Sequence, residues 1–217
     1  MIAIFDWDGT LCDSIEHIVG AMRDAAVEVA LEPPTAAEVR NIVGLGLPEA
    51  VARLFPALDN GQHVALASAY SRHFSAPERG TARLFDGAMD TLQALRSRGI
   101  ELAVATGKSR RGLNRVLAEL GLGDFFEATR CADETRSKPH PLMVHEIMGD
   151  RGKSVDEVVV IGDSEYDMAM AREAGVRSVA VSFGVHDNER LSAFEPLAII
   201  DELPQLLDLP LWTVSPG

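Results

Sequence analysis

Four short stretches of the chain combine acidic, hydroxyl and basic side chains in patterns that could do chemistry. Asp6 and Asp8 stand two residues apart where the apolar run of residues 2–5 ends. Side chains alternate along a strand, so these two carboxylates point to the same side of its end. Open parallel sheets bind ligands beyond the carboxyl ends of their strands. Two acids at this position favour a functional site over a solvated turn.

The other three stretches follow later apolar runs or lie between them. Thr106 and Gly107 follow a second run, Lys138 precedes a proline in the segment 132–141, and the sequence Gly-Asp-Ser-Glu-Tyr-Asp occupies residues 162–167. Each has a structural interpretation by itself: a helix N-terminus, a loop lysine, and a turn that carries two acids. Their joint occurrence is harder to explain in this way and favours a single site.

Apolar runs rich in isoleucine and valine alternate with helical patterns, which is typical of an α/β fold with a parallel sheet between helices. The runs expected to form strands are residues 2–5, 100–105, 157–162, 177–182 and 197–200. Residues 14 to about 80 contain no such run and instead show helical spacing. We therefore predict a Rossmann-like parallel sheet, residues 1–13 and 82–217, with a helical domain, residues 14–81, inserted after the first strand.

In order and spacing, these motifs resemble those of the haloacid dehalogenase superfamily of phosphotransferases. The resemblance covers nearly the whole chain, through Asp-Trp-Asp-Gly-Thr at residues 6–10, the threonine after the next strand, the Lys-Pro pair and the motif at residues 162–167. The helical insertion is similar to the cap of the subfamily that includes phosphoglycolate phosphatases and beta-phosphoglucomutases. The resemblance implies a phosphatase that acts on a small phosphorylated metabolite.

The resemblance also implies a role for each acid. Asp6 would attack the substrate phosphorus and form an aspartyl-phosphate. Asp8 would protonate the leaving oxygen, then activate water, and offer its backbone carbonyl to a metal ion. Asp6 and Asp163 would bind the ion directly, and Asp167 would act from behind them or through water.

Phosphate binding is expected from three further groups. The Lys138 ammonium, the Thr106 hydroxyl and the Gly107 backbone N–H would hold the phosphoryl oxygens. The carboxylates around the site would repel a phosphate dianion, since two like unit charges ~4 Å apart cost ~4 kcal/mol at an effective dielectric constant of about 20. A cation is therefore required as well. Oxygen ligands together with a phosphate favour Mg²⁺ over zinc.

The insertion offers one candidate substrate contact, the turn at Gly44, Leu45 and Gly46, whose backbone could approach the ligand. A purely structural turn between two helices explains the same residues almost as well. Arg40 and Arg53 flank this turn and could meet a substrate carboxylate or second phosphate. Solvated helix arginines are the simpler interpretation of both.

Residue identities separate the alternatives only in part. True dehalogenases lack the acid two residues after the nucleophile, so Asp8 favours phosphoryl transfer. Phosphonoacetaldehyde hydrolase uses a lysine of its cap, and residues 13–82 contain no lysine. A sugar phosphomutase of the beta-phosphoglucomutase type remains open. So does a non-catalytic ligand-binding protein on the same scaffold, although the complete set of motif residues argues against it.

Composition limits the partners and the location. The formal net charge of -13 without a basic cluster disfavours nucleic acid. The apolar runs are far shorter than the ~20 residues of a membrane span, and an acid at position 6 argues against a secretory signal. The two cysteines, Cys12 and Cys131, support neither a disulfide framework nor a zinc site. We expect a cytoplasmic protein, and the sequence gives no indication of its oligomeric state.

Overall fold

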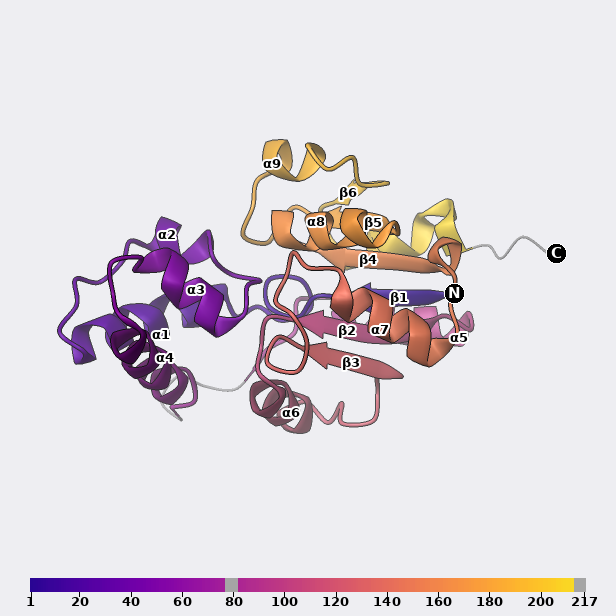
Figure 1. The fold of residues 1–217 in the computed structure, drawn as a ribbon. Coiled ribbons are helices and arrows are strands. Elements are labelled where there is room, and N and C mark those ends of the chain that lie inside the picture. Colours follow the sequence, from indigo (N-terminus) through magenta and orange to yellow (C-terminus); the bar gives the residue numbers. More distant parts are fainter. Residues whose placement is uncertain (77–81, 213–217) are drawn as a thin grey trace.

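The chain forms a parallel β-sheet covered by helices on both faces, and a group of four helices lies beyond the carboxyl ends of the strands (Figure 1). The computed structural model describes residues 1–76 and 82–212. The strands are β1 (Ile2–Phe5), β2 (Glu101–Thr106), β3 (Ala128–Cys131), β4 (Val158–Gly162), β5 (Arg177–Val181) and β6 (Ile199–Ile200). The helices of the sheet region are α5 (Ala88–Ser97), α6 (Arg110–Glu119), α7 (Leu142–Arg151), α8 (Glu165–Ala174) and α9 (Asn188–Ser192). Short 3-10 helices are η2 (Val155–Glu157), η3 (Leu203–Asp208) and η4 (Pro210–Trp212).

The order of the strands in the sheet is β3-β2-β1-β4-β5-β6, and all neighbouring pairs are parallel. The first strand of the chain thus lies in the interior of the sheet. Phe5 pairs with Val104 on one side and with Ile161 on the other, so β1, β2 and β4 end at the same edge. The predicted α/β fold with a Rossmann-like parallel sheet is confirmed, and each of the five expected strands forms.

Strand β3 was not expected from the sequence. Its four residues include Thr129 and Arg130, and three of the four are only half-buried because β3 is the edge strand of the sheet. An edge strand needs no continuous apolar run, because its unpaired edge is open to water or to polar side chains. This explains why an apolar pattern could not reveal it.

Side chains alternate between two apolar layers, one on each face of the sheet. Residues such as Phe5 and Val104 face α5, α6 and the 3-10 helices η3 and η4. Ile4 and Val160 face the opposite way, against α7 and α8. The interior strands are buried from both sides, which explains why they read as continuous Ile- and Val-rich runs. No helix among the described residues is long and apolar enough to cross a membrane.

The insertion, defined here as residues 15–74, is entirely helical and follows the first strand, as predicted. Its helices are α1 (Ile15–Glu28), α2 (Ala36–Arg40), α3 (Leu47–Leu54) and α4 (Asn60–Phe74). They enclose an apolar cluster of their own, and capping boxes begin α2 and α4. The predicted break between residues 81 and 82 borders residues 77–81, which lie outside the described part, so the exact boundary stays a prediction.

Two connections join the insertion to the sheet, and their described parts run side by side. The backbone N–H of Asp13 donates to the Arg83 carbonyl at 2.9 Å, and that of Phe85 donates to the Leu11 carbonyl at 3.0 Å. Cys12 forms an antiparallel bridge with Leu84 between these two bonds. The outgoing and returning segments therefore leave the sheet as one paired stalk beside Asp8.

Candidate active site

The structure brings the predicted motif residues together at the carboxyl edge of the sheet. Asp6 directly follows β1, Thr106 is the last residue of β2, and Asp163 directly follows β4. Lys138 reaches the same place from the loop before α7, and Asp167 comes from the first turn of α8. All five are buried. The convergence follows from the register, which ends the three central strands at one edge.

A buried lysine lies between two of the acids. Lys138 Nζ is 2.6 Å from Asp6 Oδ1 and 2.6 Å from Asp167 Oδ1. Burial alone would lower the pKa of Lys138, but the carboxylates of Asp167 and Asp6 raise it above its usual value, so the side chain stays an ammonium. One ammonium faces three carboxylates, since Asp163 lies beside this pair. The cluster therefore carries an excess of negative charge.

That excess changes the acidity of the carboxyls. Burial raises the pKa of Asp6 well above its usual value, Lys138 opposes this, and Asp167 and Asp163 add to it. Burial, and then the charge of Asp167, raises the pKa of Asp163 to about 7. Without a further cation, the ionised form of these buried carboxylates is unfavourable, because they repel one another and have little contact with water.

Hydrogen bonds fix two of the three carboxylates. Thr10 Oγ1 donates to Asp163 Oδ1 at 3.0 Å, and the backbone N–H of Val185 donates to Asp163 Oδ2 at 2.9 Å. The backbone N–H and hydroxyl of Ser164 donate to Asp167 Oδ2 at 3.1 and 2.6 Å. These bonds set the direction of both side chains before any ligand arrives.

The three acids fit a hard divalent cation. Asp6, Asp163 and Asp167 each offer an oxygen within 4.8 Å of the other two. Asp6 Oδ2 is buried without a hydrogen-bond partner among the described residues. A buried and unpaired carboxylate oxygen beside two other carboxylates is the donor set that Mg²⁺ prefers. The Asp8 side chain lies outside this group, which is compatible with the expected use of its backbone carbonyl.

Asp8 has partners that the sequence did not reveal. Ser14 Oγ donates to Asp8 Oδ1 at 2.5 Å, and Lys108 Nζ lies 3.0 Å from the same oxygen. Ser14 precedes α1, and Lys108 follows the Thr106-Gly107 pair. Neither type of residue is diagnostic in a loop, so only the fold shows that both hold the second acid.

Ser137 and Gly107 meet the predicted turn of the insertion. The backbone N–H of Gly46 donates to Ser137 Oγ at 2.7 Å. A Cβ at Gly107 would lie 2.4 Å from the Leu45 carbonyl oxygen and 2.8 Å from that of Gly44. Position 107 therefore admits only glycine while the turn sits here. The structure places the turn against the site, and a direct contact with substrate stays a prediction.

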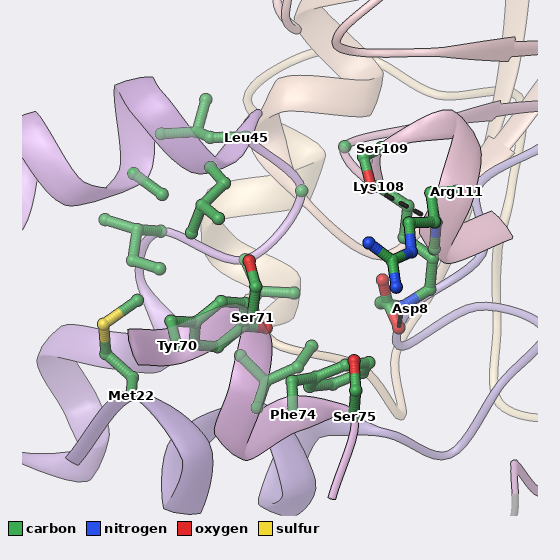
Figure 2. Close-up of a pocket in the computed structure, with 18 of the residues that line it drawn as sticks. Asp8, Met22, Leu45, Tyr70, Ser71, Phe74, Ser75, Lys108, Ser109 and Arg111 are labelled. Atoms are coloured by element: carbon green, nitrogen blue, oxygen red, sulfur yellow. Dashed lines mark hydrogen bonds and ion pairs between the residues drawn. The ribbon is translucent and has the colours of Figure 1, made fainter. Parts of the chain in front are cut away.

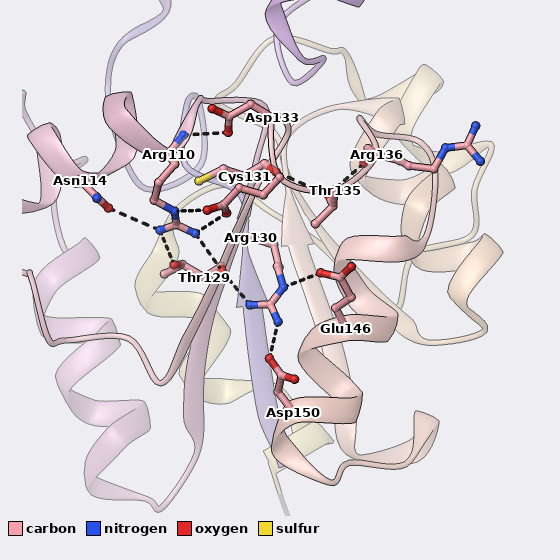
Figure 3. Close-up of polar contacts among 11 residues, drawn as sticks. Arg110, Asn114, Thr129, Arg130, Cys131, Asp133, Thr135, Arg136, Glu146 and Asp150 are labelled. Atoms are coloured by element: carbon pink, nitrogen blue, oxygen red, sulfur yellow. Dashed lines mark hydrogen bonds and ion pairs between the residues drawn. The ribbon is translucent and has the colours of Figure 1, made fainter.

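A polar network joins the loop after β2 to the loop that leads to Lys138 (Figure 3). Arg110, the first residue of α6, donates from its side chain to both carboxylate oxygens of Glu134 at 2.8 and 2.7 Å. Its backbone N–H donates to Asp133 Oδ1 at 2.8 Å, and its guanidinium also bonds Thr129 of β3. This two-pronged ion pair fixes the relative position of the two loops that carry the predicted phosphate-binding groups.

A second link between the insertion and the sheet region centres on Asn41. Tyr166 Oη donates to the Asn41 carbonyl at 2.7 Å, and Arg190 Nη1 donates to its side-chain oxygen at 2.6 Å. Arg190, from α9, also pairs with Glu165. No sequence pattern indicated this link, because it joins residues more than a hundred positions apart.

The two arginines that flank the turn lie outside the cavity. Arg40 pairs with Glu16 on the surface of the insertion, and the Arg53 guanidinium lies over the Tyr166 ring, 5.5 Å from its centroid. Neither lines the cavity beside the acids. Their simpler interpretation, as residues of exposed helices, agrees with these positions.

A cavity of about 720 Å³ opens between the insertion and the sheet edge, with Asp6 and Asp8 in its wall. Figure 2 shows Asp8, Lys108 and Arg111 on the side of the sheet, and Met22, Tyr70 and Phe74 on the side of the insertion. The acids are therefore accessible from a space large enough for a small organic ligand.

Comparison with known proteins agrees with this geometry. Residues 3–181 match the family model of haloacid dehalogenase-like hydrolases. A phosphoglycolate phosphatase of Rhodospirillum rubrum is 32% identical, with 94% of this chain and 88% of the relative aligned. A phosphoglycolate phosphatase of Agrobacterium fabrum is 31% identical, with 94% and 90% aligned.

Solved structures give the same result for the fold. A hydrolase from Pseudomonas syringae superimposes with a TM-score of 0.87 at 23% identity and covers 96% of each chain. A haloacid dehalogenase-like hydrolase of Streptococcus pneumoniae superimposes with a TM-score of 0.82 at 25% identity, over 95% of this chain and 96% of the other. With its acids, lysine and threonine gathered at the sheet edge, the chain belongs to the haloacid dehalogenase-like hydrolase family.

Proposed function

We propose that this protein is a Mg²⁺-dependent phosphatase that hydrolyses a small phosphomonoester through an aspartyl-phosphate on Asp6. One observation carries the proposal: the buried Asp6 carboxylate lies in a cluster with Lys138, Asp163 and Asp167, at the wall of a ligand-sized cavity. The coarser statement, that the chain is a phosphatase of its family, rests on the family match and on relatives named as phosphatases along nearly its full length.

The reaction would proceed in two displacements at phosphorus. In the first, an Asp6 oxygen attacks, the bond from phosphorus to the alcohol oxygen breaks, and Asp8 gives that oxygen its proton. In the second, water attacks the same phosphorus, Asp8 takes the proton of the water, and the bond to Asp6 breaks. Ser14 and Lys108 hold the Asp8 carboxylate in place for both proton transfers.

The remaining motif residues would bind the phosphoryl group and the metal. Mg²⁺ held by Asp6, Asp163 and the Asp8 carbonyl, with Asp167 behind them, would neutralise the carboxylates and the phosphoryl oxygens. Thr106, Gly107 and Lys138 would donate to those oxygens. We assign residues 1–13 and 82–217 to the catalytic domain and residues 14–81 to a cap, whose turn at 44–46 contacts the substrate. We place the enzyme in the cytoplasm.

The nucleophile is tested by replacing Asp6 and searching for the intermediate. Asp6→Asn should lower Mg²⁺-dependent phosphate release by about 10⁴-fold or more, since both displacements use this carboxylate. Asp13→Asn, an exposed acid on the adjacent stalk, is the matched control and should keep full activity. Acid-quenched wild-type enzyme should carry one phosphoryl group on the peptide that contains Asp6.

Retention of activity by Asp6→Asn would end the proposal, and a quenched enzyme that never carries phosphate would end the covalent mechanism. Phosphoglycolate is the first substrate to test, because close relatives are named for it. Formation of an isomerised sugar phosphate in place of free phosphate would identify a mutase instead.

Metal binding has a readout that does not depend on activity. Mg²⁺ at ~100 times its dissociation constant should stabilise the fold by about 2.7 kcal/mol, which raises the midpoint of thermal unfolding by several degrees. Asp163→Asn should abolish this increase, because it removes one oxygen ligand and one of the charges that the ion neutralises. An equal increase in the variant would show that the ion binds elsewhere.

A further inference from the structure

The cavity beside Asp8 has two walls of different chemistry (Figure 2). The sheet side presents cations, Lys108 and Arg111, next to the acids. The insertion side is mainly apolar. Four of its half-buried side chains leave part of their surface on the cavity: Leu45, Leu47, Tyr70 and Phe74. Met22, from α1, forms a deeper part of the same wall.

The apolar side chains of this wall belong to a packed part of the insertion. The four half-buried side chains pack on one side against the apolar cluster of the insertion, which holds them in place. Their other side faces the cavity. A contiguous apolar surface in a cleft is favoured energetically only when a ligand or partner removes it from water.

The space is enclosed by docked parts rather than left by a separated insertion. At one end, the Gly46 N–H binds Ser137 Oγ at 2.7 Å and the Leu45 carbonyl lies against Gly107. At the other end, Lys108 Nζ lies 4.5 Å from the centre of the Phe74 ring. The insertion thus already touches the sheet region on both sides of the cavity.

A cavity of about 720 Å³ lies in the range that holds drug-sized ligands. A two-carbon ester such as phosphoglycolate would fill the end near Asp6 and Asp8 and leave the apolar wall in contact with water. Its carboxylate would gain nothing from that wall, because charged groups lose hydration against apolar side chains.

We propose that the physiological substrate is a phosphomonoester of an alcohol with an apolar body, branched-alkyl or aromatic, which covers the insertion wall while its phosphoryl group lies at Asp6. This deepens the proposed function and depends on it, since the wall selects the leaving alcohol of the same reaction. The binding energy of the body would be available to seat the phosphoryl group for attack.

Arg111 supplies the competing hypothesis. It is exposed on the cavity and has no ion-pair partner among residues 1–76 and 82–212, whereas Arg115 on the same helix pairs with Glu119. A small substrate with a carboxylate could bind Arg111 and make no contact with the apolar wall. The two hypotheses predict opposite orders of substrate preference, so one substrate series decides between them.

The series consists of ethyl, butyl, 3-methylbutyl and 2-phenylethyl phosphate, with phosphoglycolate as the reference that carries a carboxylate. All are esters of primary alcohols, so the four members with an uncharged alcohol body differ little in leaving-group reactivity. We expect kcat/KM with Mg²⁺ to rise about threefold per added methylene until the wall is covered, and at least tenfold from ethyl to the best larger ester. The branched and phenyl members show whether the wall prefers an alkyl or an aromatic body.

A flat series with phosphoglycolate the best substrate would overturn the apolar-body proposal and leave the phosphatase intact. Failure of the wild-type enzyme to release phosphate from any ester, phosphoglycolate included, would instead overturn the proposed function itself. Competition by 2-phenylethylphosphonate, which cannot be hydrolysed, should be at least tenfold tighter than by ethylphosphonate and tests binding apart from chemistry.

A pair of matched variants connects the preference to the wall. Leu47→Asn places an amide on the cavity surface and should lower the ratio of kcat/KM for 2-phenylethyl over ethyl phosphate by fivefold or more. Leu58→Asn makes the same change at another half-buried leucine that packs on the insertion cluster but does not line the cavity. It should leave that ratio unchanged, and an equal loss in both variants would contradict the assignment.

Discussion

The sheet edge and the insertion form opposite walls of one cavity and are built in opposite ways. At the sheet edge, Lys138 and three carboxylates are buried together and oriented by hydrogen bonds from Thr10, Ser164 and Val185. The insertion presents apolar side chains that pack mainly on their own cluster. The polar groups at the sheet edge are thus held by charge and by hydrogen bonds, whereas the insertion wall is formed by apolar packing.

The two regions are also joined weakly relative to their internal bonding. Direct links include the Gly46–Ser137 bond, the two bonds to Asn41 and the close approach of Leu45 to Gly107. A typical hydrogen bond contributes about 0.5–1.5 kcal/mol net. Links of this size allow an insertion to open and close in each turnover, while the buried charges at the sheet edge keep their positions.

After loss of the nucleophile, the largest effect is expected from removing the positive charge at the sheet edge. Lys138→Met should lower kcat roughly a hundred- to a thousandfold, because the phosphoryl oxygens lose a fixed cation. It should also destabilise the fold by about 3–5 kcal/mol, because buried carboxylates lose their partner. Saturating Mg²⁺ should restore part of this stability. Urea unfolding with and without Mg²⁺, together with kcat, measures all three.

The same substitution at the other end of the sheet is the control. Lys153 Nζ lies 2.5 Å from a carboxylate oxygen of Glu101, at the start of β2 and away from the acids. Lys153→Met should cost less than about 1 kcal/mol and leave kcat unchanged. If both variants lose activity equally, the effect comes from stability and the site assignment for Lys138 is wrong.

The difference between the two regions also explains how far the sequence could lead. Each acid of the motifs stands just after an apolar run: Asp6 and Asp8 after the first, Asp163 after a later one. Because parallel strands end at one edge of a sheet, the local pattern and the expected topology together predicted that these acids lie close together. Strand β3 was not predicted, because as an edge strand it carries polar residues and no apolar run. The helical insertion was predicted from the spacing of its apolar residues and from the absence of a strand-like run, because both are local signals.

Contacts between segments distant in the sequence were not predictable in the same way. The Tyr166–Asn41 and Arg190–Asn41 bonds and the Lys108–Asp8 pair join segments that only the fold brings together. Tyrosine, asparagine and arginine on helices have many structural uses, so their identities carry no signal. A single sequence therefore reveals the motif residues more fully than the contacts between the insertion and the sheet region.

An intermediate effect is expected where the two regions touch through backbone. Gly107→Ala would place a Cβ 2.4 Å from the Leu45 carbonyl oxygen, so the turn of the insertion must shift. We expect kcat/KM to fall about ten- to a hundredfold, with a change in unfolding free energy below about 1 kcal/mol. Gly123→Ala, where a Cβ meets nothing within 4 Å, is the control and should behave as wild type. Unchanged kcat/KM in Gly107→Ala would show that the turn need not sit here during turnover.

The smallest effect tests one side-chain link of the insertion. Tyr166→Phe removes the hydroxyl that donates to the Asn41 carbonyl at 2.7 Å but keeps the ring beside His186. Losing about 1 kcal/mol from the closed arrangement should raise KM about fivefold and leave kcat within about twofold.

Asn41→Ala keeps the carbonyl that Tyr166 uses and removes only the amide that binds Arg190. The two substitutions thus break separate bonds, and their effects on KM should multiply in the double variant. If Asn41→Ala raises KM and Tyr166→Phe does not, the arginine alone holds the insertion closed.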